Sequence, residues 1–76
     1  MYRINKPRKS IRNLLTNQEI KTLELAANGL DNPHIGKKLF ISSHTVKAHM
    51  AAIYKKLEVA NRTQAVYVAM KKHIIE

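Results

Sequence analysis

Residues 32–57 read NPHIGKKLFISSHTVKAHMAAIYKKL, and they contain the two helices on which the predicted fold depends. Its first part predicts a short helix over residues 33–40, because Asn32 can cap it and Pro33 suits the first position, where no N–H is needed. Gly36 costs on the order of 1 kcal/mol relative to alanine inside a helix. A close backbone crossing at Gly36 would explain that cost. The residues of this helix expected in the core are Ile35, Leu39 and Phe40.

The second part of the stretch predicts a longer helix over residues 43–57, capped by Ser42. Apolar residues recur at i, i+4, i+7 and i+11, which places one stripe in the core: Val46, Met50, Ile53 and Leu57. The opposite face carries His44, Lys47, Ala48, Ala51 and Lys55, and no acid occurs from Ser43 through Leu57. A short helix, a tight turn and a longer basic helix form a helix-turn-helix, whose second helix fits the major groove of DNA.

Another helix is predicted before this stretch, over residues 17–28. Thr16 followed three residues later by Glu19 is a capping box, in which each side chain bonds the other residue's backbone N–H. Gly29 is free to adopt the left-handed backbone that ends the helix.

A fourth helix is predicted over residues 62–72, because Asn61 and Gln64 again have capping spacing. It carries two apolar stripes: Ala65, Val68 and Ala69 form one, and Tyr67, Met70 and Ile74 form the other. So small a domain cannot cover both, so the second stripe predicts a partner surface.

The predicted fold class is therefore all-α: a compact four-helix helix-turn-helix domain over residues 15–76. A basic, flexible arm is expected over residues 1–14, where five Lys and Arg occur and no acid precedes Glu19. The arm is either an electrostatic attractor for phosphates or the remnant of a linker.

Composition limits the class of partner. The chain has 76 residues and a formal net charge of +9, from 14 Lys and Arg against five Asp and Glu. Such a charge favours a polyanion: DNA, RNA or an anionic membrane surface. No apolar run approaches the roughly 20 residues of a membrane span, so a cytoplasmic protein without membrane contact is expected. Single-stranded RNA recognition usually needs stacked aromatic side chains, and only three Tyr and one Phe are present.

Catalysis is not expected. The chain lacks cysteine, which excludes a thiolate zinc site and a cysteine nucleophile. No Ser-His-carboxylate set follows from the spacing. The histidines are His34, His44, His49 and His73, and no pair of them has the i, i+4 zinc-binding spacing. The predictions are therefore no enzyme activity, no cofactor, no metal and no small-molecule ligand.

The motifs ISSHTVKAH at 41–49 and KLEVANRTQAV at 56–66 resemble the LuxR/GerE family, a domain type that also ends many two-component response regulators of the NarL/FixJ type. The resemblance runs from Leu15 to about Ile74. It implies a four-helix domain that binds promoter or operator DNA for bacterial transcription regulation, as a homodimer through its last helix. RNA polymerase is a further expected partner.

Site residues follow from this resemblance and the helix face together. The base-facing set is Lys47, Ala48, Ala51 and His44. The phosphate-contacting set is Asn32, Ser43, Thr45, His49, Lys55 and Lys56. The dimer-interface set is Tyr67, Met70 and Ile74.

The sequence departs from the family pattern at five places: Gln18, Thr22, Pro33–His34, Ala52 and Glu58, the last standing where Gly is common. Ala51 and Ala52 leave few hydrogen-bonding groups on the outer face of the third helix, which favours readout of DNA shape. The alternative is a protein-interaction module of the same fold that has lost specific DNA reading and acts by heterodimerisation.

Overall fold

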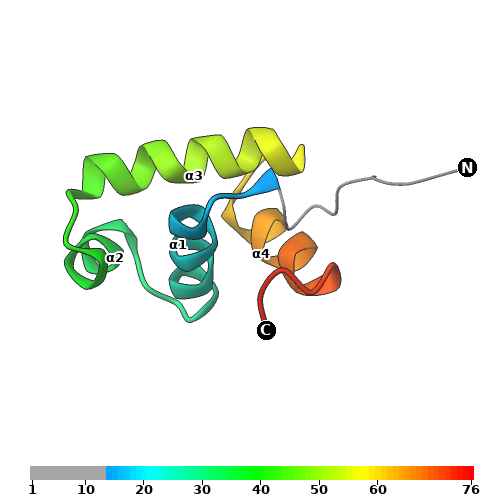
Figure 1. Cartoon of the computed structure of the whole chain (residues 1–76), viewed down its shortest axis with the longest axis horizontal. Helices are drawn as coiled ribbons and strands as arrows, with labels where there is room; N and C mark the ends of the chain where they lie inside the picture. The colour runs from blue at the N-terminus through cyan, green and yellow to red at the C-terminus, as the bar shows by residue number, and fades with distance from the viewer. Residues whose placement is uncertain (1–13) are drawn as a thin grey trace, which may run out of the picture.

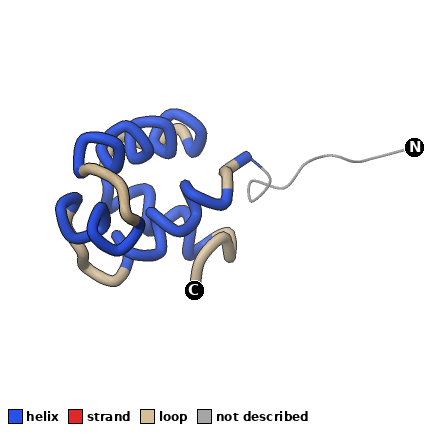
Figure 2. The backbone as a smooth tube through the Cα atoms, turned by 60° about the vertical axis from the view of Figure 1, so that its left-hand side comes forward, coloured by secondary structure: helices blue, strands red, loops and turns tan. Residues whose placement is uncertain are grey.

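The computed structural model describes residues 14–76, and every regular element in that range is helical (Figure 2). The helices are α1 (Asn17–Ala27), α2 (Asn32–Leu39), α3 (Ser43–Leu57) and α4 (Arg62–Lys71). The all-α, four-helix prediction is confirmed, and each predicted bound lies within one residue of the observed one. Apart from Leu14, the arm expected over residues 1–14 lies outside the described residues.

Helix α3 is the central element of the fold. It contacts each of the other three helices, with α2 beside its N-terminal end and α4 toward its C-terminal end (Figure 1). The predicted stripe of α3 is buried, with Val46 and Ile53 fully inaccessible. Leu23 of α1 and Ile35 of α2 complete the same core and are also fully buried. Burial of this stripe fixes which face of α3 is left for solvent.

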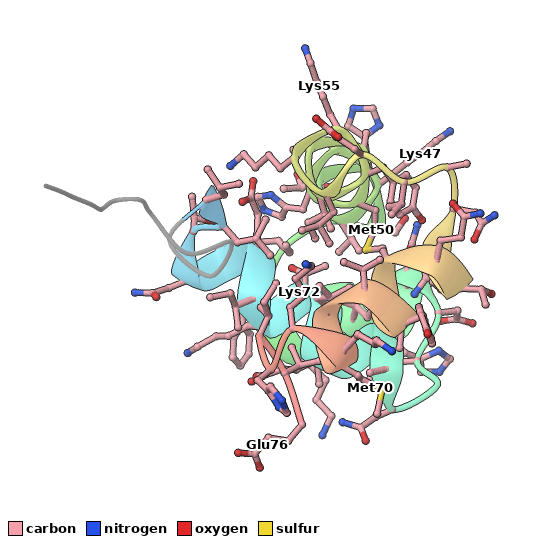
Figure 3. The ribbon with its side chains drawn as sticks, turned by 90° about the vertical axis from the view of Figure 1, so that its right-hand side faces the viewer. Lys47, Met50, Lys55, Met70, Lys72 and Glu76 are labelled. Atoms are coloured by element: carbon pink, nitrogen blue, oxygen red, sulfur yellow. The ribbon has the colours of Figure 1, made fainter. Side chains whose placement is uncertain are left out.

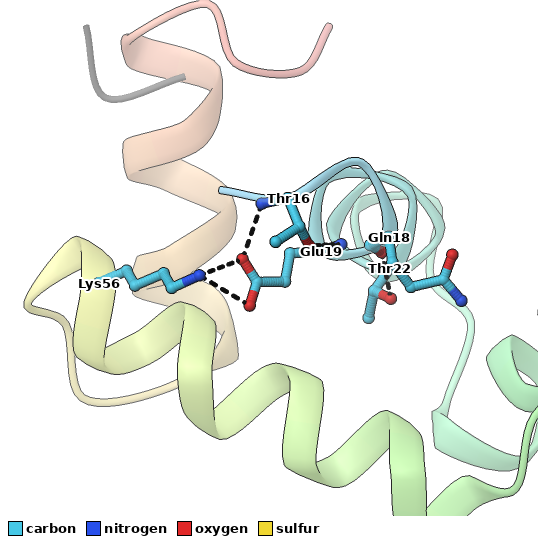
Figure 4. A network of polar contacts seen from close by, with 5 residues as sticks. All are labelled: Thr16, Gln18, Glu19, Thr22 and Lys56. Carbon is cyan, nitrogen blue, oxygen red and sulfur yellow. Dashed lines mark hydrogen bonds and ion pairs between the residues drawn. The ribbon is translucent and has the colours of Figure 1, made fainter. Parts of the chain in front are cut away.

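Local capping signals set the helix starts. The predicted capping box of α1 is confirmed, since Glu19 N–H donates to Thr16 Oγ1 (3.1 Å) and Thr16 N–H donates to Glu19 Oε1 (2.9 Å) (Figure 4). Asn61 and Ser42 cap α4 and α3 as predicted. The cap of α2 is Asp31, whose side chain accepts from His34 N–H (3.0 Å). The assignment of this cap to Asn32 was wrong, because Asn32 already lies in the first turn.

The corner between α2 and α3 is tight. A Cβ placed on Gly36 would lie 2.6 Å from the carbonyl oxygen of Ile41, so the predicted close backbone crossing is confirmed. The chain turns there because Phe40 adopts a left-handed backbone with φ 60°. Phe40 is 94% exposed, and its expected place in the core was wrong. Helical spacing assigned it to the core, but the helix ends at Leu39 and the left-handed residue points its ring outward.

The C-terminal segment folds back on the core. Helix α4 ends at Lys71, and His73 takes a left-handed backbone with φ 60°. The N–H of Ile74 then donates to Ala69 O (2.8 Å), and both Ile74 and Ile75 become buried. The prediction that Ile74 lies in a dimer interface was wrong, because it assumed that the helical spacing continued beyond Lys71.

Candidate nucleic-acid interface

The outer face of α3 is the candidate interface. Buried Met50 points toward the body of the domain, whereas Lys47 and Lys55 project away from it (Figure 3). All four residues predicted to face bases are exposed, and they are His44, Lys47, Ala48 and Ala51. Ser43 and Lys55, predicted to contact phosphate, are exposed as well.

Helical geometry gathers these residues. His44, Ala48, Ala51 and Lys55 recur at i, i+4, i+7 and i+11, so they form one strip along α3, and Lys47 borders it. This strip lies opposite the buried stripe of Val46, Met50, Ile53 and Leu57. Because α3 contains no acid, the strip presents only positive or neutral groups over a helix of 15 residues.

The start of α3 presents oriented hydroxyl groups. Ser42 Oγ accepts from Thr45 N–H (3.0 Å) and donates to Thr45 Oγ1 (3.0 Å). Because the Thr45 oxygen already accepts a bond, its own O–H remains a donor. Thr45 is half-buried at the edge of the outer strip, where a donor of this kind suits a phosphate oxygen.

Lys56 does not belong to the outer strip. Its Nζ lies 2.8 Å and 3.0 Å from the two carboxylate oxygens of Glu19 in α1 (Figure 4). Lys56, predicted to contact phosphate, is thus paired with a carboxylate of the same domain. The physical reason is its helical position, which turns Lys56 toward the flank of α3 that packs on the start of α1.

Glu19 is held in its charged form by this pairing. Burial of the carboxyl raises its pKa, but the hydrogen bonds from Lys56 and the Thr16 backbone and the charges of Lys56 and His49 outweigh burial. The net result is a lowered pKa for Glu19. Helical spacing places half-buried His49 on the same flank of α3 as Lys56.

The start of α2 holds a second polar cluster. Asp31 Oδ1 lies 2.6 Å from His34 Nδ1, and the hydrogen bonds from the His34 side chain and backbone hold the pKa of the Asp31 carboxyl below its ordinary value. Next to it, Asn32 Oδ1 accepts a hydrogen bond from Arg62 Nη2 at the start of α4 (2.5 Å). Asn32, predicted to contact phosphate, is thus held by a residue 30 positions away.

Two contacts near the interface could not be predicted from the sequence. The partners in Arg62–Asn32 and Lys56–Glu19 lie 30 and 37 positions apart, and neither spacing forms a local motif.

Two large apolar side chains of the predicted dimer stripe are exposed on α4. They are Tyr67 (62% exposed) and Met70 (49% exposed). Among residues 14–76, no cluster of three His, Asp or Glu side chains suits a metal ion, and no helix is long and apolar enough to cross a membrane.

Similarity to known proteins is evidence that is independent of the geometry of the site. A family model described as bacterial regulatory proteins, luxR family, matches residues 13–69. The chain is 44% identical over 61 residues to the transcriptional regulatory protein LiaR of Bacillus subtilis (strain 168), covering 80% of this chain and 29% of LiaR. It is 39% identical over 71 residues to the response regulator protein VraR of Staphylococcus aureus (strain NCTC 8325 / PS 47), covering 93% and 34%.

Among solved structures, the chain is similar to the response regulator ChrA of a heme-sensing two-component system. The TM-score is 0.78 at 43% identity, over 92% of this chain and 33% of ChrA. The chain therefore spans about a third of the length of the relatives that it matches.

Proposed function

The chain belongs to the luxR family of bacterial regulatory proteins, and from that premise we propose that it binds specific sites in double-stranded DNA and regulates transcription. The observation that carries this proposal is the acid-free outer strip of α3, which is exposed along its length and lies opposite the core. A helix with such a face can enter the major groove, which is about 12 Å wide. Relatives named as transcriptional regulators support the proposal.

Each part of the strip has a proposed role. Lys47 donates to guanine O6 and N7 from a central position. His44, Ala48 and Ala51 face bases, with the two alanines against thymine methyl groups or allowing close approach. The proposed phosphate contacts are Asn32, Ser43, Thr45, His49 and Lys55. These contacts set the register of α3 in the groove but carry no sequence information.

Two chains act together in this proposal. Tyr67 and Met70 are the large apolar side chains that remain exposed on α4, whereas Ala65 and Ala69 are buried. Pairing of two such faces would join two domains on two half-sites, and the affinities would multiply. The protein would then act in the bacterial cytoplasm at promoters, with RNA polymerase as a further partner.

The test is selection of bound duplexes from a random-sequence pool, repeated at two salt concentrations. We expect a consensus with two related half-sites and an affinity that falls steeply with salt. Lys47→Ala is expected to cost about 1–3 kcal/mol and to relax base preference at one position. Lys72→Ala is the matched control, because it removes one exposed charge from the end of α4 and should leave base preference unchanged.

Three outcomes would revise the proposal. Salt-sensitive binding without a consensus would mean that the basic surface attracts DNA without reading it. An unchanged preference in Lys47→Ala would contradict the central role of that lysine. Absence of binding at low salt would favour the heterodimerising interaction module.

A further inference from the structure

Arg62 lies where two helices and one loop meet. Its Nη1 donates to the carbonyl oxygen of Leu30 (3.2 Å), and its Nη2 donates to Asn32 Oδ1 (2.5 Å). One guanidinium therefore joins the start of α4 both to the loop before α2 and to the first residue of α2. Arginine suits this task because its planar fork places two donors at fixed directions.

This contact fixes the orientation of the Asn32 amide. A guanidinium has donors and no acceptor, so it can bond only the oxygen of the amide. The amide nitrogen must then face the other way, and among residues 14–76 no hydrogen bond from Nδ2 to an acceptor is formed. Asn32 is half-buried at the N-terminus of α2. Its contact with Arg62 therefore holds the two N–H donors of the amide in one direction.

We infer that Arg62 is a positioning residue for DNA binding, which aims the Asn32 side-chain N–H donors at a phosphate oxygen of the duplex. This inference rests on the proposed function. Arg62 itself touches no DNA in this arrangement and acts through Asn32. Because the amide is already held before DNA binds, binding does not incur the entropic cost of immobilising a freely rotating side chain.

The variant Asn32→Asp separates the two contacts of this side chain. A carboxylate still accepts from Arg62, and the added charge strengthens that bond. It has no N–H to donate and repels the phosphate. We expect the melting temperature of the free protein to stay the same or rise. Affinity for a random-sequence duplex at low salt should fall about tenfold or more, since a hydrogen bond to a charged phosphate is lost.

A double-mutant cycle tests the coupling between the two residues. Arg62→Gln is expected to weaken duplex binding roughly threefold to tenfold beyond the effect of Lys72→Gln, which removes one charge from elsewhere on the surface. In an Asn32→Ala background the additional effect of Arg62→Gln should disappear. If Arg62 were merely structural, Arg62→Gln would weaken binding equally in both backgrounds.

The outcomes distinguish this inference from the proposed function. If the wild-type chain binds duplex DNA but the cycle is additive, or if Asn32→Asp binds as the wild type does, only the inference is overturned. If the wild-type chain binds no duplex at low salt, both are overturned. Should Arg62→Gln fail to fold, Asn32→Asp alone decides, because a fall in its melting temperature or an unchanged affinity would contradict the inference.

Discussion

Glu58 ends α3 with a left-handed backbone, φ 59° and ψ 47°. An L-residue pays about 1–2 kcal/mol for this conformation because its Cβ crowds a neighbouring carbonyl, and glycine avoids that strain. We predict that Glu58→Gly raises the free energy of unfolding by about 1 kcal/mol, the strain relief being partly offset by the greater freedom of glycine in the unfolded chain. Urea denaturation of the wild type and the variant measures this difference in the free energy of unfolding. Glu58→Ala keeps the strain and should give no gain, and equal stabilities of the two variants would contradict the explanation.

Glu19 predicts how stability changes in acid. Its pKa is lowered in the folded protein from the ordinary value of 4.5. The unfolded chain therefore binds a proton before the folded one does, so the stabilisation is present above the unfolded pKa and is lost as the pH falls through the folded pKa. We expect the free energy of unfolding to decline as the pH falls below about 4.5.

Glu19→Gln isolates this contribution. The variant should be less stable than the wild type near neutral pH, and its stability should depend less on pH between that range and strong acid. Asp31→Asn is the comparison, because the Asp31 carboxyl is exposed and also has a lowered pKa. Thermal unfolding across a pH series measures how the stability of each of the two variants depends on pH. A Glu19→Gln profile parallel to that of the wild type would show that the Lys56 pair contributes nothing to acid sensitivity.

At the scale of the elements, Gly36 governs how closely α2 approaches the turn into α3. Alanine has the better helix propensity by about 1 kcal/mol. Its Cβ would nevertheless lie 2.6 Å from Ile41 O, a backbone atom that cannot rotate away. We predict that Gly36→Ala destabilises the domain by about 1–3 kcal/mol. The sign of the change in chemical denaturation is the test, because stabilisation would mean that propensity outweighs the clash.

The elements also show what the sequence could predict. Helix starts depend on side chains within three residues of one another, so the caps at Thr16, Ser42 and Asn61 could be identified directly. Helical periodicity likewise predicted both faces of α3. Errors arose where a left-handed residue broke that periodicity, which exposed Phe40 and buried Ile74. Periodicity carries no information about such a break.

The exposed surface that forms the candidate site could be predicted from the sequence only where it lies on one helix. His44, Lys47, Ala48 and Ala51 were identified from the face opposite the core, and all are exposed. The pairings of Lys56 with Glu19 and of Asn32 with Arg62 depend on how helices from distant parts of the chain pack together. No local pattern encodes them.

At the scale of the whole molecule, the exposed apolar surface of α4 predicts self-association. Tyr67 and Met70 are 62% and 49% exposed, and the Tyr67 ring lies under Lys71 Nζ at 5.9 Å. We expect Tyr67→Glu to weaken association about tenfold or more, since it places a charge in an apolar contact. The variant should fold, because the introduced carboxylate would face Lys71 at the favourable i, i+4 spacing.

Sedimentation equilibrium at high protein concentration measures the association constant. Lys72→Glu is the control, because it changes the charge at the end of the same helix without altering the two apolar side chains. Identical sedimentation of the wild type and Tyr67→Glu would exclude this face as the dimer contact.

The opposed faces of α3 have a consequence for how the specificity of this domain can be altered. The stripe that holds the fold together and the strip proposed to read bases share a helix but no side chain. Exposed surface substitutions usually change stability by no more than about 0.5 kcal/mol. A combinatorial library randomised at residues 44, 47, 48 and 51 should therefore consist largely of folded proteins. Selection from such a library would sort its members by operator preference, and new target sites could be acquired by point mutation without loss of the scaffold.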